Sequence, residues 1–224
     1  MGKKVLLMSA TILNAKGFAK SLGISPDDYE TISIPSPFPV QNRPVIQAGV
    51  GSMSSKMIDK TLPKIKDAVK AILEEHKNEK GIIHCHTYKI ANYLKKHVRS
   101  RRILIHDSKN RDEILQKHME SSKPTVLISP SMTEGVDLKG DLSKFQIICK
   151  VPYPYLGDPI VRKRMAKNNK WYPMKTAINI VQSCGRSVRS SEDTAVTYIL
   201  DSDWHNFYRK NLDVFPKGFR SCIV

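Results

Sequence analysis

Short apolar runs alternate with longer amphipathic stretches along most of the chain. The short runs predict β-strands over residues 4–10, 81–85, 103–105, 125–129, 145–151 and 195–200. The longer stretches carry apolar residues at helical spacing and predict helices over residues 15–22, 59–76, 90–98, 111–119 and 176–189. Strands that are apolar almost throughout and alternate with helices indicate a parallel α/β sheet covered by helices on both faces.

Residues 26–54 break this alternation. Prolines interrupt any regular element in this segment, at positions Pro26, Pro35, Pro37, Pro39 and Pro44. We therefore expect an extended crossing with at most one short strand. The predicted organisation is an N-terminal segment and linker over residues 1–55, followed by one α/β domain over residues 56–224. Within that domain, residues 153–173 are predicted to form a short helical insertion.

The composition adds a strong positive charge to this picture. The chain has 224 residues, 40% of them hydrophobic, and carries 37 Lys and Arg against 21 Asp and Glu, a formal net charge of +16. The apolar runs exclude an intrinsically disordered chain, and no run approaches the roughly 18 residues of a membrane span. The Lys-containing start does not fit a secretory signal. We expect a cytoplasmic protein, nuclear if eukaryotic, whose charge attracts a polyanion and which has no membrane partner.

The cysteines and histidines do not form a metal-binding pattern. The four cysteines include no C-x-x-C pair, so we expect neither a zinc ribbon nor an iron–sulfur ligand set. Cys85, Cys149 and Cys222 lie among apolar neighbours and are expected in the core. His84 and His86 alternate along a predicted strand and would share one face, but no further ligand stands near them in the sequence. We interpret both as core or loop histidines.

Basic residues gather beside aromatic residues in one stretch of the chain, which reads Arg162, Lys163, Arg164, Lys167, Lys170, Trp171 and Tyr172. Single-stranded nucleic acid requires cations that follow its phosphates and aromatic faces that stack on its bases. The stretch therefore predicts a nucleic-acid-binding surface. The alternative is that the two aromatic residues cap a core while the basic residues only keep the surface soluble.

Three loops carry polar side chains suited to chemistry. They are Ser9-Ala10-Thr11 after the first predicted strand, residues 133–137 (TEGVD) after the strand over 125–129, and residues 182–189 (QSCGRSVR) at the end of the last predicted helix. Taken singly, each has an ordinary explanation as a turn or as an exposed basic pair. In parallel sheets, however, ligands bind beyond the carboxyl ends of the strands, in the loops that follow them.

In this order and at this spacing, the loops resemble motifs III, V and VI of superfamily 2 helicases, most closely those of the XPD/DinG-like branch. The strings that carry the resemblance are LLMSATI for motif III, IIHCHTYKIANYL for motif IV, TVLISPSMTEGVDLKGDL for motif V and QSCGRSVRSSEDTAVTYILDSD for motif VI. The resemblance covers residues 4–210. It implies a RecA-like parallel sheet, related to P-loop NTPases but without its own Walker A motif.

The resemblance also implies roles for individual residues. Arg189 would be an arginine finger for the γ-phosphate of ATP, Arg186 a second phosphate or coupling contact, and Gln182 a contact to the γ-phosphate or its attacking water. The nucleotide-binding residues would further include Glu134, Gly135, Asp137 and Gly185. The nucleic-acid-binding residues are expected to be Thr87, Tyr88, Ser131, Arg162, Lys163, Arg164 and Trp171. No metal site is expected within this chain.

The motifs that hold ATP and Mg²⁺ do not occur in the sequence. There is no G-x-x-x-x-G-K-[ST] and no D-E-x-H, and the nearest imitation, over residues 49–56, has the wrong order. The resemblance implies that these motifs belong to a first RecA-like motor domain, and that the complete protein moves 5′ to 3′ on single-stranded DNA. This chain alone is expected to be inactive. Two alternatives stay open: a stand-alone nucleic-acid-binding module without turnover, and an RNA-directed helicase domain of the same superfamily.

Overall fold

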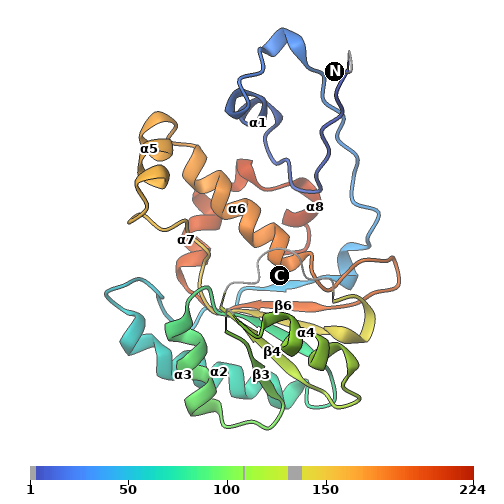
Figure 1. Ribbon diagram of the computed structural model, residues 1–224, viewed down its shortest axis with the longest axis vertical. Coiled ribbons are helices and arrows are strands. Elements are labelled where there is room, and N and C mark those ends of the chain that lie inside the picture. Colours follow the sequence, from blue (N-terminus) through green and yellow to red (C-terminus); the bar gives the residue numbers. More distant parts are fainter. Residues whose placement is uncertain (1–3, 108, 131–137) are drawn as a thin grey trace.

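A six-stranded parallel sheet forms the centre of the structure, a computed structural model that describes residues 4–107, 109–130 and 138–224 (Figure 1). The strand order is β1-β6-β5-β2-β4-β3, and each strand runs parallel to its neighbours. The strands are β1 Val45–Ile46, β2 Gly81–His84, β3 Ile103–Ile105, β4 Val126–Ser129, β5 Phe145–Ile148 and β6 Val196–Ile199. This confirms the parallel α/β sheet that the sequence pattern predicts.

The α-helices are α1 Ala15–Ser21, α2 Ile58–Glu75, α3 Tyr88–Val98, α4 Arg111–Glu120, α5 Pro159–Lys167, α6 Trp171–Cys184, α7 Asp203–Lys210 and α8 Lys217–Arg220. Short 3₁₀ turns occupy Pro26–Asp28, Val40–Asn42, Gly140–Leu142 and Leu212–Val214. Residues 153–173 contain α5 and the first turn of α6.

One face of the sheet packs against α2 and α3. Ile83, Ile128 and Ile147 point to this face from the central strands and are fully buried. The two helices contribute the apolar side chains that the helical spacing singles out, namely Leu62, Ile65, Val69, Ile72, Leu73, Ile90, Leu94 and Val98. The largest core cluster therefore lies on this side of the sheet.

The opposite face is covered by two separate groups of helices. Near one edge, Ile82 and Leu127 pack with side chains of α4. Toward the other edge, Ile148 and Ile199 pack with α6, α7 and α8 through buried side chains that include Ala177, Ile180, Trp204, Phe207 and Phe219. Figure 1 shows α2 and α3 below the sheet and α6, α7 and α8 above it. Helices thus cover both faces, as predicted.

The outer edge of β1 is covered by the last residues of the chain. The amide of Val45 donates to the carbonyl of Cys222 at 2.7 Å, and the amide of Val224 donates to the carbonyl of Val45 at 3.0 Å. Val45 and Ile223 form a parallel bridge. β1 agrees with the expectation of at most one short strand in the proline-rich segment, whereas no pattern in the sequence predicts that residues 222–224 pair with it.

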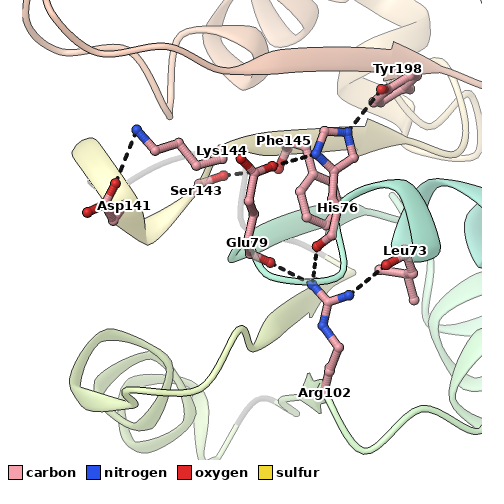
Figure 2. A network of polar contacts seen from close by, with 9 residues as sticks. All are labelled: Leu73, His76, Glu79, Arg102, Asp141, Ser143, Lys144, Phe145 and Tyr198. Carbon is pink, nitrogen blue, oxygen red and sulfur yellow. Dashed lines mark hydrogen bonds and ion pairs between the residues drawn. The ribbon is translucent and has the colours of Figure 1, made fainter.

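A network of polar contacts ties the amino-terminal ends of the strands together (Figure 2). The guanidinium of Arg102, just before β3, donates to the backbone carbonyls of Leu73, His76, Glu79 and Pro124, at 2.6 to 2.8 Å. These carbonyls lie at the end of α2 and in the segments that lead into β2 and β4. One side chain therefore satisfies carbonyls that the end of a helix leaves without an intrahelical partner.

The predicted strand over residues 4–10 is wrong. These residues are extended but pair with no strand in the described part of the chain, and Val5, Leu6 and Met8 are each about four-fifths exposed, at 80%, 78% and 81%. In Figure 1 this segment lies with α1 at the top, beyond α6 and away from the sheet. A strand needs a neighbour for its amides and carbonyls, and this sheet offers none at that place.

Candidate functional site

The helix predicted over residues 176–189 ends earlier than expected. α6 runs from Trp171 to Cys184, and the amide of Gly185 donates to the carbonyl of Val181 at 3.0 Å as the last turn closes. Arg186 and Arg189 therefore follow the helix instead of sharing one of its faces.

A carboxylate holds the residues beyond the helix in a loop. Oδ2 of Asp193 accepts the amides of Arg189 and Ser190, both at 2.8 Å. The bond from the Arg189 amide is the main reason that the pKa of Asp193 is lowered. A side-chain oxygen that binds nearby amides competes with helical hydrogen bonds, which agrees with the non-helical backbone of residues 185–193.

Arg186 and Arg189 lie in different environments. Arg186 is 9% exposed, and its carbonyl accepts the amide of Leu138 at 3.4 Å. Oγ of the adjacent Ser187 donates to Oγ of Ser143 at 2.7 Å, and both serines are buried. Arg189 is exposed. The loop is therefore anchored through its first residues and presents Arg189 at the surface.

Arg186 lies near a band of buried polar side chains on the sheet. His84, at the end of β2, contacts Oε1 of Gln146 at 3.4 Å, and Nε2 of Gln146 donates to the carbonyl of Cys184 at 3.0 Å. Burial lowers the pKa of His84 to about 4, and the positive charge of Arg186 also lowers it. His84 is therefore neutral at pH 7, and its Nε2 proton points to Gln146. The loop after α6 is thus held against the face of the sheet and does not follow a strand.

Two of the predicted loops meet although they lie far apart in the sequence. Nε2 of Gln182 donates to Oγ1 of Thr11 at 3.1 Å. Oε1 of Gln182 is buried and has no hydrogen-bond partner among the described residues. Leu13 packs against the core cluster around α6, which holds the N-terminal segment in place. The structure therefore brings the motif III-like and motif VI-like segments together.

The loop after β2 positions two further candidates. His86 adopts a left-handed backbone conformation with φ 62°, and its Nε2 donates to the carbonyl of Tyr153 at 3.1 Å. Thr87 caps α3, because its Oγ1 accepts the amide of Ile90 at 3.3 Å. That bond uses a lone pair of the hydroxyl and not its proton. Tyr88 follows at the first position of the helix and is exposed.

Four of the predicted site residues lie outside the described residues: Ser131, Glu134, Gly135 and Asp137. Gly185 is described and exposed, directly after α6.

The basic stretch forms an exposed helix. Asp158 caps α5 by accepting the amide of Ile160 at 2.7 Å, and none of the side chains of α5 is buried. Arg162, Lys163 and Arg164 are all exposed. The guanidinium carbon of Arg164 lies 5.6 Å from the ring centroid of Trp171, a cation–π contact.

The two aromatic residues after the basic run differ in their surroundings. Tyr172 stacks on Tyr153 with ring centroids 6.0 Å apart, and its hydroxyl donates to the carbonyl of Pro154 at 3.1 Å. Burial raises the pKa of Tyr172. Tyr172 therefore serves the packing of the domain, as the alternative explanation supposed, while Trp171 is only half-buried.

Residues 49–56, which imitate a phosphate-binding loop, are held in the structure by a buried carboxylate instead. Oδ1 of Asp201 accepts the amide of Met53 at 3.0 Å and its Oδ2 accepts the amide of Val151 at 2.9 Å. Lys150 Nζ donates to the carbonyl of Met53. Neither Lys150 nor Asp201 is among the predicted site residues. Lys150 lies within the predicted strand over residues 145–151, and Asp201 directly follows the predicted strand over residues 195–200.

The described residues contain neither a metal-binding cluster nor a helix that could cross a membrane. No group of three or more His, Cys, Asp or Glu side chains is placed there to hold a metal ion. The four cysteines are free thiols, and Cys85, Cys149 and Cys222 are buried as predicted. None of the described helices combines the length and the apolar character that a bilayer crossing requires.

Comparison with known proteins places these features in a family. The family described as helicase C-terminal domain matches residues 69–220. The chain is 28% identical to the ATP-dependent DNA helicase DinG of Photobacterium profundum over 88% of its own length and 31% of the relative. It is 22% identical to the ATP-dependent DNA helicase YoaA of Escherichia coli, over 83% of this chain and 30% of the relative. The chain thus spans about a third of the length of the curated relatives it matches.

Solved structures share the fold. An XPD structure from S. tokodaii superposes with a TM-score of 0.64 at 18% identity, covering 89% of this chain and 40% of that one. The sheet is accordingly a RecA-like α/β sheet, as the motif resemblance implied. Because the family match extends over most of the sequence, the chain belongs to the helicase C-terminal domain family, in the XPD/DinG branch of superfamily 2.

Proposed function

We propose that the chain is the second motor domain of an ATP-dependent DNA helicase and that it supplies an arginine finger to ATP held by a first motor domain. Its family and the names of its relatives support this proposal. The relatives are about three times as long as the part matched here. We assign the Walker motifs, which bind ATP and Mg²⁺, to the remaining part of the complete protein.

The observation that carries the proposal is the contrast between Arg186 and Arg189. The buried Arg186 fixes the loop after α6, while Arg189 in the same loop is exposed at the surface. A guanidinium supplied across an interface stabilises charge on a transferring phosphoryl group, by roughly 10³- to 10⁵-fold in the analogous GTPases. When bound, ATP would supply that phosphoryl group and Mg²⁺ would neutralise part of its charge.

Gln182 fits the same site. Its Oε1 is a buried acceptor without a partner among the described residues, beside Thr11. An acceptor of this kind can orient a water molecule or receive a proton donor from a ligand. Glu134, Gly135, Asp137 and Gly185 complete the proposed nucleotide-binding set.

The first motor domain would contact the N-terminal segment. Val5, Leu6 and Met8 are apolar and mostly exposed, and contiguous exposed apolar side chains mark interaction surfaces. We therefore assign residues 4–8 to the interface with the first domain. The contact between Gln182 and Thr11 would then link this interface to the loop that carries Arg189.

Single-stranded DNA would bind across the loop after β2 and the exposed face of α5. The proposed contacts are Thr87, Tyr88, Ser131, Arg162, Lys163, Arg164 and Trp171. Movement from 5′ to 3′ rests on the resemblance to the XPD/DinG-like branch. We place the complete protein in the cytoplasm, or in the nucleus of a eukaryote.

Arg189→Ala in the complete protein tests the proposed finger. We expect DNA-stimulated ATP hydrolysis to fall about 10³-fold or more, because the charge on the phosphoryl group loses its stabilising guanidinium. DNA affinity should change little, since Arg189 is not on the proposed DNA surface. Steady-state ATPase assays and fluorescence anisotropy measure the two effects.

Arg209→Ala serves as the matched control, because Arg209 is an exposed arginine on α7. It should leave both measurements unchanged. ATP hydrolysis by the Arg189→Ala protein at the rate of the parent would remove the finger from the proposal. No ATP hydrolysis by the parent protein itself would favour the stand-alone nucleic-acid-binding module. Tighter binding to RNA than to DNA of the same sequence would favour the RNA-directed alternative.

A further inference from the structure

We propose that Tyr155 stacks on a base of single-stranded nucleic acid and acts together with the cations of α5. The proposal rests on the proposed function, because it assumes that this face of the domain follows a nucleic-acid strand. Tyr155 was not among the residues expected to bind nucleic acid. Its side chain is 78% exposed, which is unusual for a tyrosine within an ordered turn next to a packed core.

The turn that carries Tyr155 is fixed at both ends. The amide of Asp158 donates to the carbonyl of Tyr155 at 3.1 Å, and the Asp158 carboxylate caps α5. On the other side, the carbonyl of Pro154 accepts the hydroxyl of Tyr172, and the carbonyl of Pro152 accepts Nδ2 of Asn179 at 3.2 Å. An aromatic side chain held in this way loses little conformational entropy when it binds a ligand.

The absence of a side chain at Gly157 leaves room for the ring of Tyr155. A Cβ atom at Gly157 would overlap Cζ and Cε1 of the tyrosine ring. The ring therefore lies directly against the backbone at Gly157, and a larger residue there would displace it. Because Tyr155 is 78% exposed despite this contact, most of its surface is available to a flat partner.

The neighbours of Tyr155 match a single strand and not a purely apolar partner. Leu156 and Ile160 are exposed beside it, and the following helix presents Arg162, Lys163 and Lys167 without one acidic side chain. Cations next to an exposed aromatic face bind phosphates and bases of the same strand. A helix of nine residues that buries none of its side chains gains little from packing within its own domain, which agrees with a role in binding.

Trp171 is less suited to the same task. It is half-buried, and the guanidinium of Arg164 already lies over its ring. Of these two residues, Tyr155 can stack on a base without first losing a cation–π contact.

The turn is also connected to the loop after β2. Nε2 of His86 donates to the carbonyl of Tyr153, two residues before Tyr155, and Thr87 and Tyr88 follow directly. The connection joins two groups of proposed DNA contacts into one surface. Bases that reach Tyr155 would belong to the strand whose phosphates reach Thr87.

Tyr155→Ala in the full chain tests the stacking role by fluorescence anisotropy. The probes are an oligothymidylate of about 15 nucleotides and an abasic oligomer of the same length. Loss of one stacked base should weaken binding of the oligothymidylate roughly 5- to 100-fold. Binding of the abasic oligomer and the dependence of affinity on salt should stay unchanged, because no phosphate contact is removed. Tyr155→Phe should bind like the parent, and Gly157→Ala should weaken only the oligothymidylate.

Two further variants separate the stacking role from the proposed DNA surface. Leu212→Ala removes an exposed apolar side chain elsewhere and should have no effect. Arg162→Glu combined with Lys163→Glu should weaken binding of both probes, and this tests the proposed surface itself. Normal oligothymidylate binding by Tyr155→Ala, with weakened binding by the charge variant, would overturn the stacking role alone. Equal weakening of both probes by Tyr155→Ala would also overturn it, whereas no effect of the charge variant would overturn the proposed DNA surface.

Discussion

At the scale of single residues, the burial of His84 has a consequence for stability. The ring is neutral in the folded protein because burial lowers its pKa to about 4, while an unfolded histidine has a pKa near 6.5. The unfolded chain therefore binds more protons between these values. The contribution of His84 to stability is complete above about pH 6.5, is lost as the pH falls toward 4, and amounts to about 3 kcal/mol at most.

We expect the free energy of unfolding to fall between pH 7 and pH 4.5, measured by urea denaturation. His84→Gln should make this fall shallower, because it removes one of the titrating groups. His86 and His118, whose pKa values burial also lowers, should sustain the rest of the decline. His205→Gln is a matched control on an exposed histidine. Parallel pH profiles for the parent and His84→Gln would contradict the argument.

Some features of single residues could not be predicted from the sequence. Alternation placed His84 and His86 on one face, but β2 ends at His84, and the left-handed backbone at His86 turns that side chain to Tyr153. A positive φ at a histidine leaves no signal in hydrophobic periodicity. The sequence does carry a signal for the non-helical backbone after α6, because Ser190 and Asp193 have the spacing at which a side chain binds local amides.

At the scale of elements, the Arg102 side chain connects the end of α2 to the segments that lead into β2 and β4, through hydrogen bonds to backbone carbonyls. Figure 2 shows the bonds to Leu73, His76 and Glu79. Arg102→Ala should lower the free energy of unfolding by about 2–4 kcal/mol, because several carbonyls lose a charged donor. The free energy of unfolding of Arg102→Lys should lie between those of the parent and of Arg102→Ala, since an ammonium cannot span the same set of acceptors.

Arg101→Ala is the matched control, as Arg101 is the exposed neighbour in the same turn. Urea denaturation should show no change for this variant. A loss of stability from Arg101→Ala as large as that from Arg102→Ala would indicate that net charge, and not the carbonyl network, matters here.

The helices and strands could be predicted from the sequence with unequal success. The five longer strands and α2, α3 and α4 lie close to the predicted ranges, because their apolar residues serve the core of this domain alone. The apolar run over residues 4–10 has the same pattern but no partner in the sheet. Periodicity shows that a side chain needs burial, and it does not show which surface provides it.

At the scale of the whole molecule, the residues that we propose for catalysis would complete a site only together with another domain. Arg189 is exposed, Gln182 has a buried acceptor without a partner among the described residues, and the Walker motifs do not occur in the sequence. The isolated chain should therefore show no ATP hydrolysis above the uncatalysed rate, with or without single-stranded DNA. A phosphate-release assay checks this expectation, and the complete protein serves as the positive control. Robust turnover by the isolated chain would contradict the shared site.

The edge of the sheet has a mechanical consequence. The proline-rich segment over residues 26–54, which we propose as a linker, enters the sheet as β1. This strand is bonded to β6 on one side and to residues 222–224 on the other. All of these segments run parallel, so tension applied through the linker loads their hydrogen bonds together in shear and cannot peel them apart one by one. A displacement of the N-terminal segment would thus move the whole sheet as a rigid body.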